Sequence, residues 1–590
     1  MPNPADPKYR SLSVFTPPEA ARNAEIIVLQ KTAVPPTFQQ ELWFVALCRN
    51  LARLIGEKPS MMPRTAIAQI AKMIGRELDT GAGPSEEALA AGPTLAEAGA
   101  ATEIVGSLLA EAHRKRPDDR MVAGYSFLLE GALGTLRLQS SGGDIGADRA
   151  IAEVRHRLDD ALKKGGIAPE VLMLMARAFA RAELDPGRTL QQAMMTAMEA
   201  QSPSMPAALT SAEISDHFAE LADALDNDPF EIYAELATTA AAFPAEHHAA
   251  MVGTLAMSDS EAVQEAALGF ALSPDPVVSS AALAAVSQRG RTSFVSSKVI
   301  DRLVRMRPWL SETRRPNVDT AIRALRPKAA PLLPAERWEI RGVLASLCDG
   351  AGAQSLFALA KRGRRFALAS LLVKSEIGVA DAWVRGGMTK AEADAVIAEI
   401  VSGAEAIEVS ISLLERRLAD ALAINVAVDV PPPFGLLQVV ETLGLGQLHS
   451  ESISPLVLVE SLIADLPSAR TDMVAAQAAH RASVNWEQEF ETLASWFEAG
   501  EAVEKLLQPL KTRKRRIEAV SVQLLPTRRK FWAERCAWMA ATLKEGAAEG
   551  DDTWCDFALV ARDLVGQRPL AEIPLAARIA VATVEAFEQR

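Results

Sequence analysis

From Thr210 onward, the chain alternates between Ala- and Leu-rich segments of about a dozen residues and short breaks of Pro, Asp, Ser or Gly. The breaks include DNDP, FPAE, MSDS, SPDP and QRGRTS. Ala and Leu lead the helix propensity scale, whereas strands favour β-branched and aromatic side chains. Short helices with such short connections are typical of stacked helical hairpins. We therefore predict an all-α fold in which residues 206–422 form a helical array.

Two consecutive segments in this region share a pattern. SDSEAVQEAALGFAL begins at Ser258 and SPDPVVSSAALAAVS at Ser273, and each places an Asp before a Val and an Ala pair. Asp259 and Asp275 are expected to cap the two helices, and the small Ala pairs permit close helix contact. The pattern resembles the second-helix entry of HEAT-type repeats, which implies an α-solenoid.

The resemblance departs from the HEAT pattern at two points. The two Asp residues stand 16 positions apart, which is closer to one helix than to a repeat of about 40–47 residues. The Arg that commonly follows the first Val is also missing, with Ser279 nearby instead. An irregular helical array without a true repeat therefore remains the alternative to a divergent HEAT-like solenoid.

Breaks in helical periodicity divide the remaining chain. Residues 1–36 are Pro-rich and are predicted as a tail or arm, and residues 37–205 as an N-terminal helical domain. Near AINVAVDVPPPFG the Val/Ile alternation and three prolines exclude a continuous helix, so we predict a linker over residues 423–453. Helical segments return in residues 454–590, which we predict as a C-terminal helical domain.

Composition indicates the compartment. The four cysteines, Cys48, Cys348, Cys536 and Cys555, are scattered without a CxxC pair, which fits a reducing environment. The N-terminus lacks a basic segment followed by an apolar one, and no run approaches about 20 apolar residues. We therefore expect a cytoplasmic protein with no membrane partner.

Motifs for catalysis or cofactor binding are absent from the sequence. It contains no GxxxxGKS or GxxxxGKT phosphate loop, no GxGxxG and no HExxH. The segment GYSFL has Leu128 where a GxSxG nucleophile elbow needs glycine. Cys48 and Cys536 lie on apolar helix faces and read as buried, inert thiols. We therefore predict a protein that is not an enzyme and holds no cofactor or metal.

Positive charge is concentrated in an otherwise acidic chain of net charge −13. Between Arg289 and Lys374, eighteen Lys and Arg face six Asp and Glu, a local balance of +12. The i, i+3 spacing places each pair on one helix face, and stacked helices would then form a basic strip. The candidate binding residues of this segment are Arg302, Arg305, Arg323, Arg326, Arg364 and Arg365. Simple solvation or pairing with neighbouring acids is the alternative.

A second basic cluster spans residues 511–538 and has nine basic residues against two acids. Its candidate binding residues are Arg515, Arg516, Arg528 and Arg529. The cations that follow Pro526 crowd the first turn of a helix and oppose its macrodipole, at a cost of about 0.3–1 kcal/mol each. A sequence that tolerates this cost is expected to use the charge on phosphate or on an acidic partner.

These observations favour a non-enzymatic helical-repeat scaffold that binds another, unidentified protein. The alternative is an α-solenoid that binds nucleic acid, or another acidic ligand, through its basic helix faces. A surface that neutralises phosphate should retain random duplex at low salt and lose it steeply as salt rises, so salt dependence separates the two hypotheses.

Overall fold

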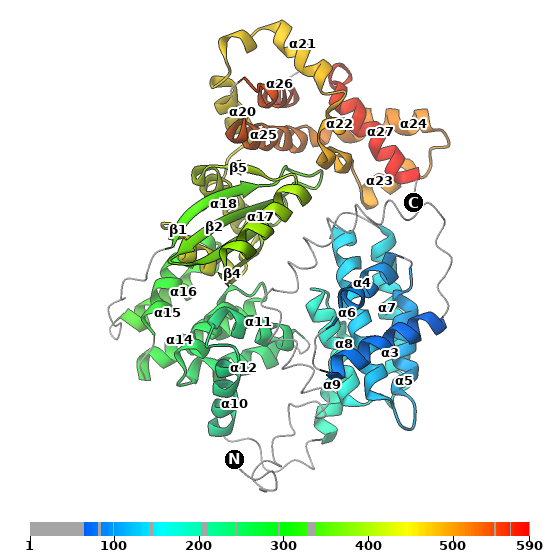
Figure 1. Cartoon of the computed structure of the whole chain (residues 1–590), viewed down its shortest axis with the longest axis vertical. Coiled ribbons are helices and arrows are strands. Elements are labelled where there is room, and N and C mark those ends of the chain that lie inside the picture. The colour runs from blue at the N-terminus through cyan, green and yellow to red at the C-terminus, as the bar shows by residue number, and fades with distance from the viewer. Residues whose placement is uncertain are drawn as a thin grey trace. The chain divides into compact units, whose positions relative to one another are not determined.

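The chain is described by a computed structural model (Figure 1). The structure describes residues 64–588, apart from residues 98 and 567 and the segments 81–83, 142–144, 202–210, 242–244, 293–295, 327–337 and 548–549. The predicted tail at residues 1–36, the start of the predicted N-terminal domain and Cys48 lie outside these residues. The chain divides into two compact units, with residues 50–271 and 275–289 in the first and residues 272–274 and 290–590 in the second.

The first unit opens with a bundle built around one long helix, α6. The bundle consists of α3 (Arg64–Thr80), α4 (Glu86–Glu97), α5 (Ala101–Ala112), α6 (Asp119–Ser141), α7 (Ile145–Leu162), α8 (Pro169–Arg181) and α9 (Arg188–Gln201). Helix α6 packs against α3, α4, α5, α7 and α8. Its Leu128, Leu129 and Leu133 have no exposed surface, so the core of the bundle lies around this helix.

Glycines allow the helices of this bundle to approach closely. A Cβ on Gly124 of α6 would lie 1.9 Å from the Ala71 carbonyl oxygen of α3. A Cβ on Gly75 of α3 would lie 2.1 Å from the Arg120 oxygen. Gly124, which belongs to the GYSFL segment, therefore allows α6 to cross α3 at close distance.

The first unit continues with α10 (Ser211–Ala224), α11 (Pro229–Ala240), α12 (Ala245–Met257), α13 (Glu261–Gly269) and most of α14 (Pro276–Thr292). Asp275 accepts a hydrogen bond from the Val277 backbone at 2.7 Å, as expected of a cap. The cap of α13 is Ser260 rather than Asp259. Asp259 instead pairs with Arg289 at 3.3 Å.

The second unit contains a five-stranded antiparallel sheet of order β4-β3-β2-β1-β5. Its strands are β1 (Glu339–Ala345), β2 (Ala353–Arg362), β3 (Arg365–Lys374), β4 (Gly378–Met388) and β5 (Ile407–Val409). Before the sheet come α15 (Ser297–Met306) and α16 (Arg315–Leu325).

Several helices pack on this sheet. Helix α17 (Lys390–Gly403) contacts β3, while α18 (Ile411–Val428) and α19 (Gly435–Leu443) contact β4. A Cβ on Gly435 would lie 1.8 Å from the Ala382 carbonyl oxygen, so α19 can begin directly against the backbone of β4. These helices hold the sheet inside the unit and leave its β2–β3 turn at the surface.

The rest of the second unit is helical again. It comprises α20 (Pro455–Ala464), α21 (Met473–Ala482), α22 (Trp486–Glu489), α23 (Glu501–Leu507), α24 (Arg513–Ala519), a π-helical turn (Val520–Leu524), α25 (Arg529–Gly546), α26 (Thr553–Val565) and α27 (Pro574–Glu588). Helices α25 and α26 pack closely together and carry several fully buried side chains, including Trp538 and Phe557. No helix among the described residues is long and apolar enough to cross a membrane.

The prediction of a mostly helical chain is confirmed, but the all-α prediction is wrong over residues 339–409. Strands β2 and β3 are rich in Ala and Leu, which favour helices, and their pairing across a sheet overrides that preference. The segment 423–453, predicted as a linker, includes the end of α18 and all of α19. Helix α18 ends where Asp429 adopts a left-handed conformation before the three prolines.

Candidate binding surfaces

Arg302 and Arg305 of α15 make contacts within the chain. The guanidinium of Arg302 donates to both carboxylate oxygens of Glu441, at 2.7 and 2.9 Å, and its side chain is 2% exposed. Arg305 pairs with Asp301 at 2.6 Å. Arg302 therefore fastens α15 to α19 and is too buried to belong to a basic strip at the surface, while the charge of Arg305 is paired within its own helix.

Arg323 and Arg326 of the predicted strip are exposed at the end of α16. Arg323 Nε donates to the Asp319 carbonyl oxygen of its own helix at 3.1 Å. The two residues therefore lie at the surface. The prediction placed them in one strip with Arg302 and Arg305, and Arg302 is buried.

Most of the second predicted cluster also contacts the chain itself. Arg516 pairs with Glu588 at 2.8 Å, and Arg528 pairs with Glu498 at 2.9 Å. Arg529 donates to the Leu564 and Gly566 carbonyl oxygens, at 3.0 and 2.7 Å, which satisfies the carboxyl end of α26. Arg528 and Arg529, at the start of α25, therefore stabilise neighbouring structure. Arg515 remains exposed, together with Lys511, Lys514 and Lys530.

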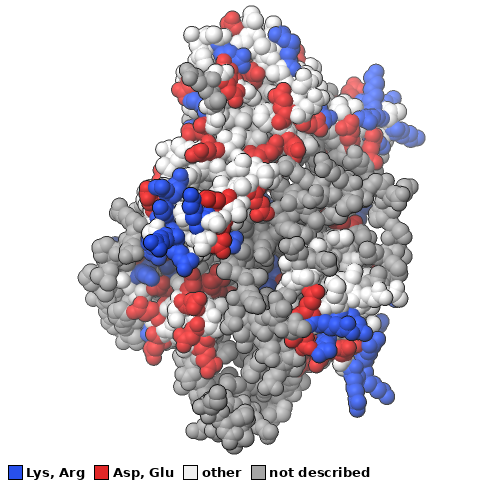
Figure 2. All heavy atoms as spheres, viewed as in Figure 1, with Lys and Arg blue, Asp and Glu red and all other residues white. Residues whose placement is uncertain are grey.

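Arg364 and Arg365 lie in the turn between β2 and β3, at one end of the sheet. The antiparallel register pairs Arg362 with Arg365 and Lys361 with Phe366. Arg385 of β4 lies nearby, because its partner across the ladder is Leu368 of β3. We refer to Lys361, Arg362, Arg364, Arg365 and Arg385 as the basic sheet end. Figure 2 shows Lys and Arg side chains gathered over this part of the molecule.

Neutral groups orient three cations of the basic sheet end. The Arg362 guanidinium lies over the Trp338 ring, 4.7 Å from its centroid, and the Lys361 ammonium lies 5.8 Å from the Phe366 centroid. Arg365 donates to the Gly387 carbonyl oxygen at 2.7 Å. A π face or a carbonyl fixes the direction of a cation without cancelling its charge.

The carboxylates near this surface are engaged elsewhere. Glu339 pairs with Arg341 at 2.6 Å. Glu392 accepts hydrogen bonds from the backbone N–H and the hydroxyl of Thr389 in the capping box of α17. These bonds, together with nearby Arg385 and Arg365, lower the pKa of Glu392. Considering only described residues, no carboxylate forms an ion pair with Lys361, Arg364, Arg365 or Arg385.

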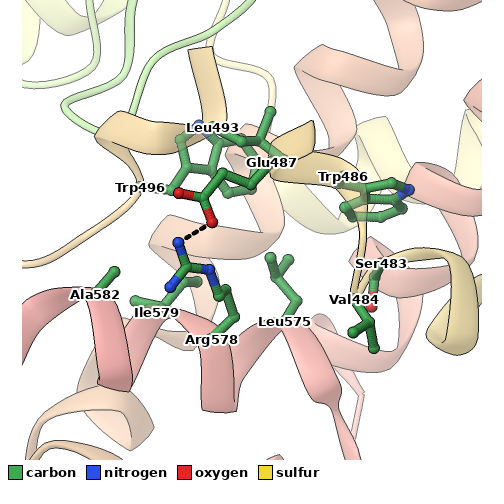
Figure 3. A pocket seen from close by; sticks show the side chains of 10 residues that line it. All are labelled: Ser483, Val484, Trp486, Glu487, Leu493, Trp496, Leu575, Arg578, Ile579 and Ala582. Carbon is green, nitrogen blue, oxygen red and sulfur yellow. Dashed lines mark ion pairs between the residues drawn. The ribbon is translucent and has the colours of Figure 1, made fainter. Parts of the chain in front are cut away.

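The pocket in Figure 3 lies among the C-terminal helices. Trp486 and Trp496 line one side, and Leu575 and Ile579 of α27 line the other. An ion pair between Glu487 and Arg578 spans it. Its volume of about 10 Å³ has room for a single water molecule.

A buried polar junction joins β2, α18 and α25. The Arg417 guanidinium donates to Gln354 Oε1 at 3.2 Å and to Asp420 at 2.9 Å. Arg535 of α25 has no exposed surface and donates to the Gly350 carbonyl oxygen at 2.9 Å. Burial raises the pKa of Asp420. These charges lie inside the fold and connect its layers.

The described cysteines are buried and free. Burial raises the pKa of Cys348 to about 12 and that of Cys555 to about 11, and it also raises the pKa of Cys536. All three thiols are therefore protonated at neutral pH and are poor nucleophiles. Among the residues that the structure describes, no group of three or more His, Cys, Asp or Glu side chains is arranged to hold a metal ion.

Sequence reasoning found the turn residues of the basic sheet end but missed Arg385 and Trp338. Arg385 lies on β4 and Trp338 directly precedes β1, and the sheet register brings both to the same end. The signal that was available is the tetrapeptide FALA, which occurs on both sides of KRGRR. Two matching apolar segments around a short Gly-containing turn are typical of a β-hairpin.

Comparisons with known proteins give partial matches to two family models and to one curated protein. A family model described as the Y4lR C-terminal helical domain matches residues 457–588, and one described as the Y4lR second domain matches residues 244–329. The uncharacterized protein y4lR of Sinorhizobium fredii (strain NBRC 101917 / NGR234) is 28% identical over 254 residues, which cover 42% of this chain and 47% of that protein. The match thus spans about half the length of that relative.

No solved structure matches the chain. The two family models leave residues 330–456 unmatched, and these residues include the whole sheet.

Proposed function

We propose that the chain is a non-catalytic binding protein whose basic sheet end contacts an acidic surface of a partner protein. The observation that carries this proposal is the way the cations are held. Neutral groups orient Lys361 and Arg365, so these two cations are preorganised for an anion. A preorganised side chain loses less entropy when a partner binds.

The charge distribution supports the same proposal. The chain carries a net charge of −13, yet this end of the sheet gathers five cations. Complementary charge at the rim of an interface increases association rates and suppresses wrong partners. An acidic protein surface fits this end, whereas a basic one would be repelled.

We propose that the helices of the first unit serve as a HEAT-like scaffold. Helix α10 contacts α11 and α12, while α13 contacts α11 and α12. Contacts between every second helix are what two stacked hairpins produce. This arrangement supports a solenoid-like stack of α10–α11 on α12–α13.

The non-catalytic part of the proposal rests on the interior groups. The described thiols are protonated, and the buried charges of Arg417 and Arg535 are used to join layers of the fold. The pocket in Figure 3 is too small for a substrate. We also propose a cytoplasmic location, which the free thiols of Cys348, Cys536 and Cys555 support.

Nucleic-acid binding is the second candidate function. It is favoured by a second group of exposed cations, Lys511, Lys514, Arg515 and Lys530, around α24 and the start of α25. A polymer of phosphates could use several such surfaces, and its affinity would fall steeply with salt. Trp338 and Phe366 argue against base stacking, because cations lie over their rings.

A pull-down with charge-reversed variants tests the proposal. Arg364→Glu/Arg365→Glu should lose the proteins that the unaltered chain retains from a nuclease-treated native lysate. The matched control, Lys514→Glu/Arg515→Glu, makes the same charge change on another exposed surface and should retain them. Equal retention by both variants would dismiss the basic sheet end, and retention of proteins only from a lysate without nuclease treatment would favour nucleic acid.

A further inference from the structure

Strand β4 forms an outer edge of the sheet, because it stands at one end of the order β4-β3-β2-β1-β5 (Figure 1). An outer strand presents a row of N–H and C=O groups with which another extended chain can pair. We propose that an extended acidic segment of the partner protein adds to this edge as a further strand, beside residues 384–386. The inference rests on the proposed function and deepens it, because it names the conformation of the partner segment and the backbone that it contacts.

The first half of this edge is closed by groups of the chain itself. The Val379 N–H donates to Asn425 Oδ1 at 2.8 Å, and the Val379 carbonyl oxygen accepts from Asn425 Nδ2 at 3.3 Å. The Asn425 amide therefore takes the place of a neighbouring strand. Farther along, the Ala382 carbonyl oxygen lies against Gly435 at the start of α19. The Ala382 N–H donates to Asp381 Oδ1 at 2.9 Å. Both Val379 and Ala382 thus direct their backbone groups away from β3.

The second half of the edge is open among the described residues. The N–H and C=O groups of a strand residue point to one side, and successive residues alternate between the two sides. Counting from Ala382, Val384 and Gly386 direct these groups outward, while Arg385 between them faces Leu368 of β3. Within the described part of the chain, no group outside the ladder bonds the backbone of Val384 or Gly386. Gly386 is exposed, with open space around a Cβ built on it, so an incoming chain can approach it closely.

A β-bulge limits the length of the open stretch. The register of β4 on β3 shifts between Phe366 and Leu368, where two glycines of β4 stand opposite one residue of β3. Such a bulge bends the strand and interrupts regular pairing. At the bulge, Arg365 donates to the Gly387 carbonyl oxygen at 2.7 Å. The open stretch is therefore residues 384–386, which offers two bonding positions to an added segment.

The charge at this edge favours an acidic segment. Considering only described residues, the Arg385 guanidinium makes no hydrogen bond or ion pair. Facing residues of neighbouring strands have Cβ atoms about 4.5–5.5 Å apart, and opposite charges there stabilise the pair. A Glu or Asp that faces Arg385 would meet this cation. A second copy of the chain fits less well, because two-fold pairing of the stretch would place two Arg385 side chains opposite each other.

Fluorescence anisotropy with the full chain and labelled peptides tests this inference. The probe is a peptide of about eight residues in which Thr and Glu alternate. Two relatives of equal charge carry N-methyl groups, one on every Thr and the other on every Glu. In an antiparallel arrangement, like that of the sheet itself, the Glu that faces Arg385 directs its N–H away from β4, and the Thr residues bond Val384 and Gly386. We expect methylation of Thr to weaken binding at least about tenfold and methylation of Glu to weaken it less than about threefold.

Two substitutions at Val384 separate the backbone from the side chain. Val384→Pro removes the outward N–H without removing a ladder bond, a position at which an outer strand tolerates proline. It should weaken binding of the unmodified peptide at least about fivefold, whereas Val384→Thr keeps the N–H and should bind as the unaltered chain does. Arg385→Gln should also weaken binding, and the matched control Arg515→Gln should not. Circular dichroism checks that each variant is folded, and the N-methylated peptides test the same point on the unaltered chain if Val384→Pro does not fold.

Each contrary outcome has a distinct meaning. Equal affinity of the three peptides would overturn the added strand, and loss of that binding in Arg364→Glu/Arg365→Glu would keep the proposed function. Failure of every peptide to bind would also overturn the added strand, while the pull-down decides the proposed function separately. Self-association of the full chain in sedimentation velocity, abolished by Val384→Pro, would overturn the acidic partner segment and assign the edge to a second copy.

Discussion

Removing Glu441 should destabilise the second unit strongly, because the Arg302 side chain that it pairs with is buried. Two hydrogen bonds of 2.7 and 2.9 Å join the two groups, and Arg302 is 2% exposed while Glu441 is 31% exposed. Breaking a buried pair by removing one partner costs about 3–5 kcal/mol. We expect Glu441→Leu to lose about that much free energy of unfolding.

The opposite variant should cost less. Arg302→Met leaves a carboxylate that water can reach, so we expect a loss of about 1–3 kcal/mol. The double variant Arg302→Met/Glu441→Leu should recover much of the loss, since an apolar pair of similar volume replaces a buried ion pair at little cost. The exposed control Arg323→Met should change stability by no more than about 0.5 kcal/mol.

Urea unfolding followed by tryptophan fluorescence measures these differences. Trp309 is buried and donates to the Leu448 carbonyl oxygen at 3.1 Å, and most of the other tryptophans also lie in the second unit, so the emission reports on unfolding of this unit. A loss below about 1 kcal/mol for Glu441→Leu would refute the reasoning. An Arg302 variant of unchanged stability that no longer binds a partner would instead support the sequence-based assignment of Arg302 to a binding surface.

Three further predictions concern other parts of the chain. Gly124→Ala should destabilise the first unit by about 1–3 kcal/mol in urea unfolding, because the new Cβ would lie 1.9 Å from the Ala71 oxygen. The control variant Gly253→Ala, at a helix position with open space around it, should leave the stability unchanged or increase it. Asp563 is buried, which raises its pKa, but hydrogen bonds from His480, Arg562 and Arg568 lower that pKa to about 2. An unfolded aspartate has a pKa of about 3.9, so the ionised Asp563 stabilises the fold fully above about pH 4, and this stabilisation is lost as the pH falls to about 2. In Asp563→Asn, the free energy of unfolding should therefore depend less on pH over that interval. Cys348 should react with a thiol reagent at neutral pH no faster than the fold opens, since its pKa is about 12; rapid labelling of the folded chain would contradict this assignment.

Helix positions were largely predictable from the sequence because the signals are local. Pro169 and Pro229 stand in the first turns of α8 and α11, where a missing N–H costs nothing. The C-terminal helical domain predicted at residues 454–590 overlaps the matched region 457–588. Helix caps and the spacing of apolar residues depend on a few neighbouring residues, so a single sequence is enough to recognise them.

The sheet was not predicted, because the cause of its strands lies in residues distant in sequence. Strand β2 is Ala- and Leu-rich, and it becomes a strand by pairing with β1 and β3. The small side chains Ala358, Ala360 and Ala367 are buried in the sheet, where they pack without needing β-branched residues. Residue propensity alone therefore indicated helix.

Local sequence also does not show which basic residues are buried in ion pairs and which are exposed. Arg302 lies 139 positions from its partner Glu441, and Arg528 lies 30 positions from Glu498. Identical i, i+3 patterns can thus be buried pairs or exposed charges. The structure separates them, and the exposed members of the predicted set are Arg323, Arg326, Arg364, Arg365 and Arg515.

The affinity of a purified retained partner tests the central claim most directly. Titration calorimetry should give a dissociation constant at least about tenfold weaker for Arg364→Glu/Arg365→Glu than for the unaltered chain. Lys514→Glu/Arg515→Glu should stay within about twofold. Equal affinities for the two variants would contradict the assignment of partner binding to the basic sheet end.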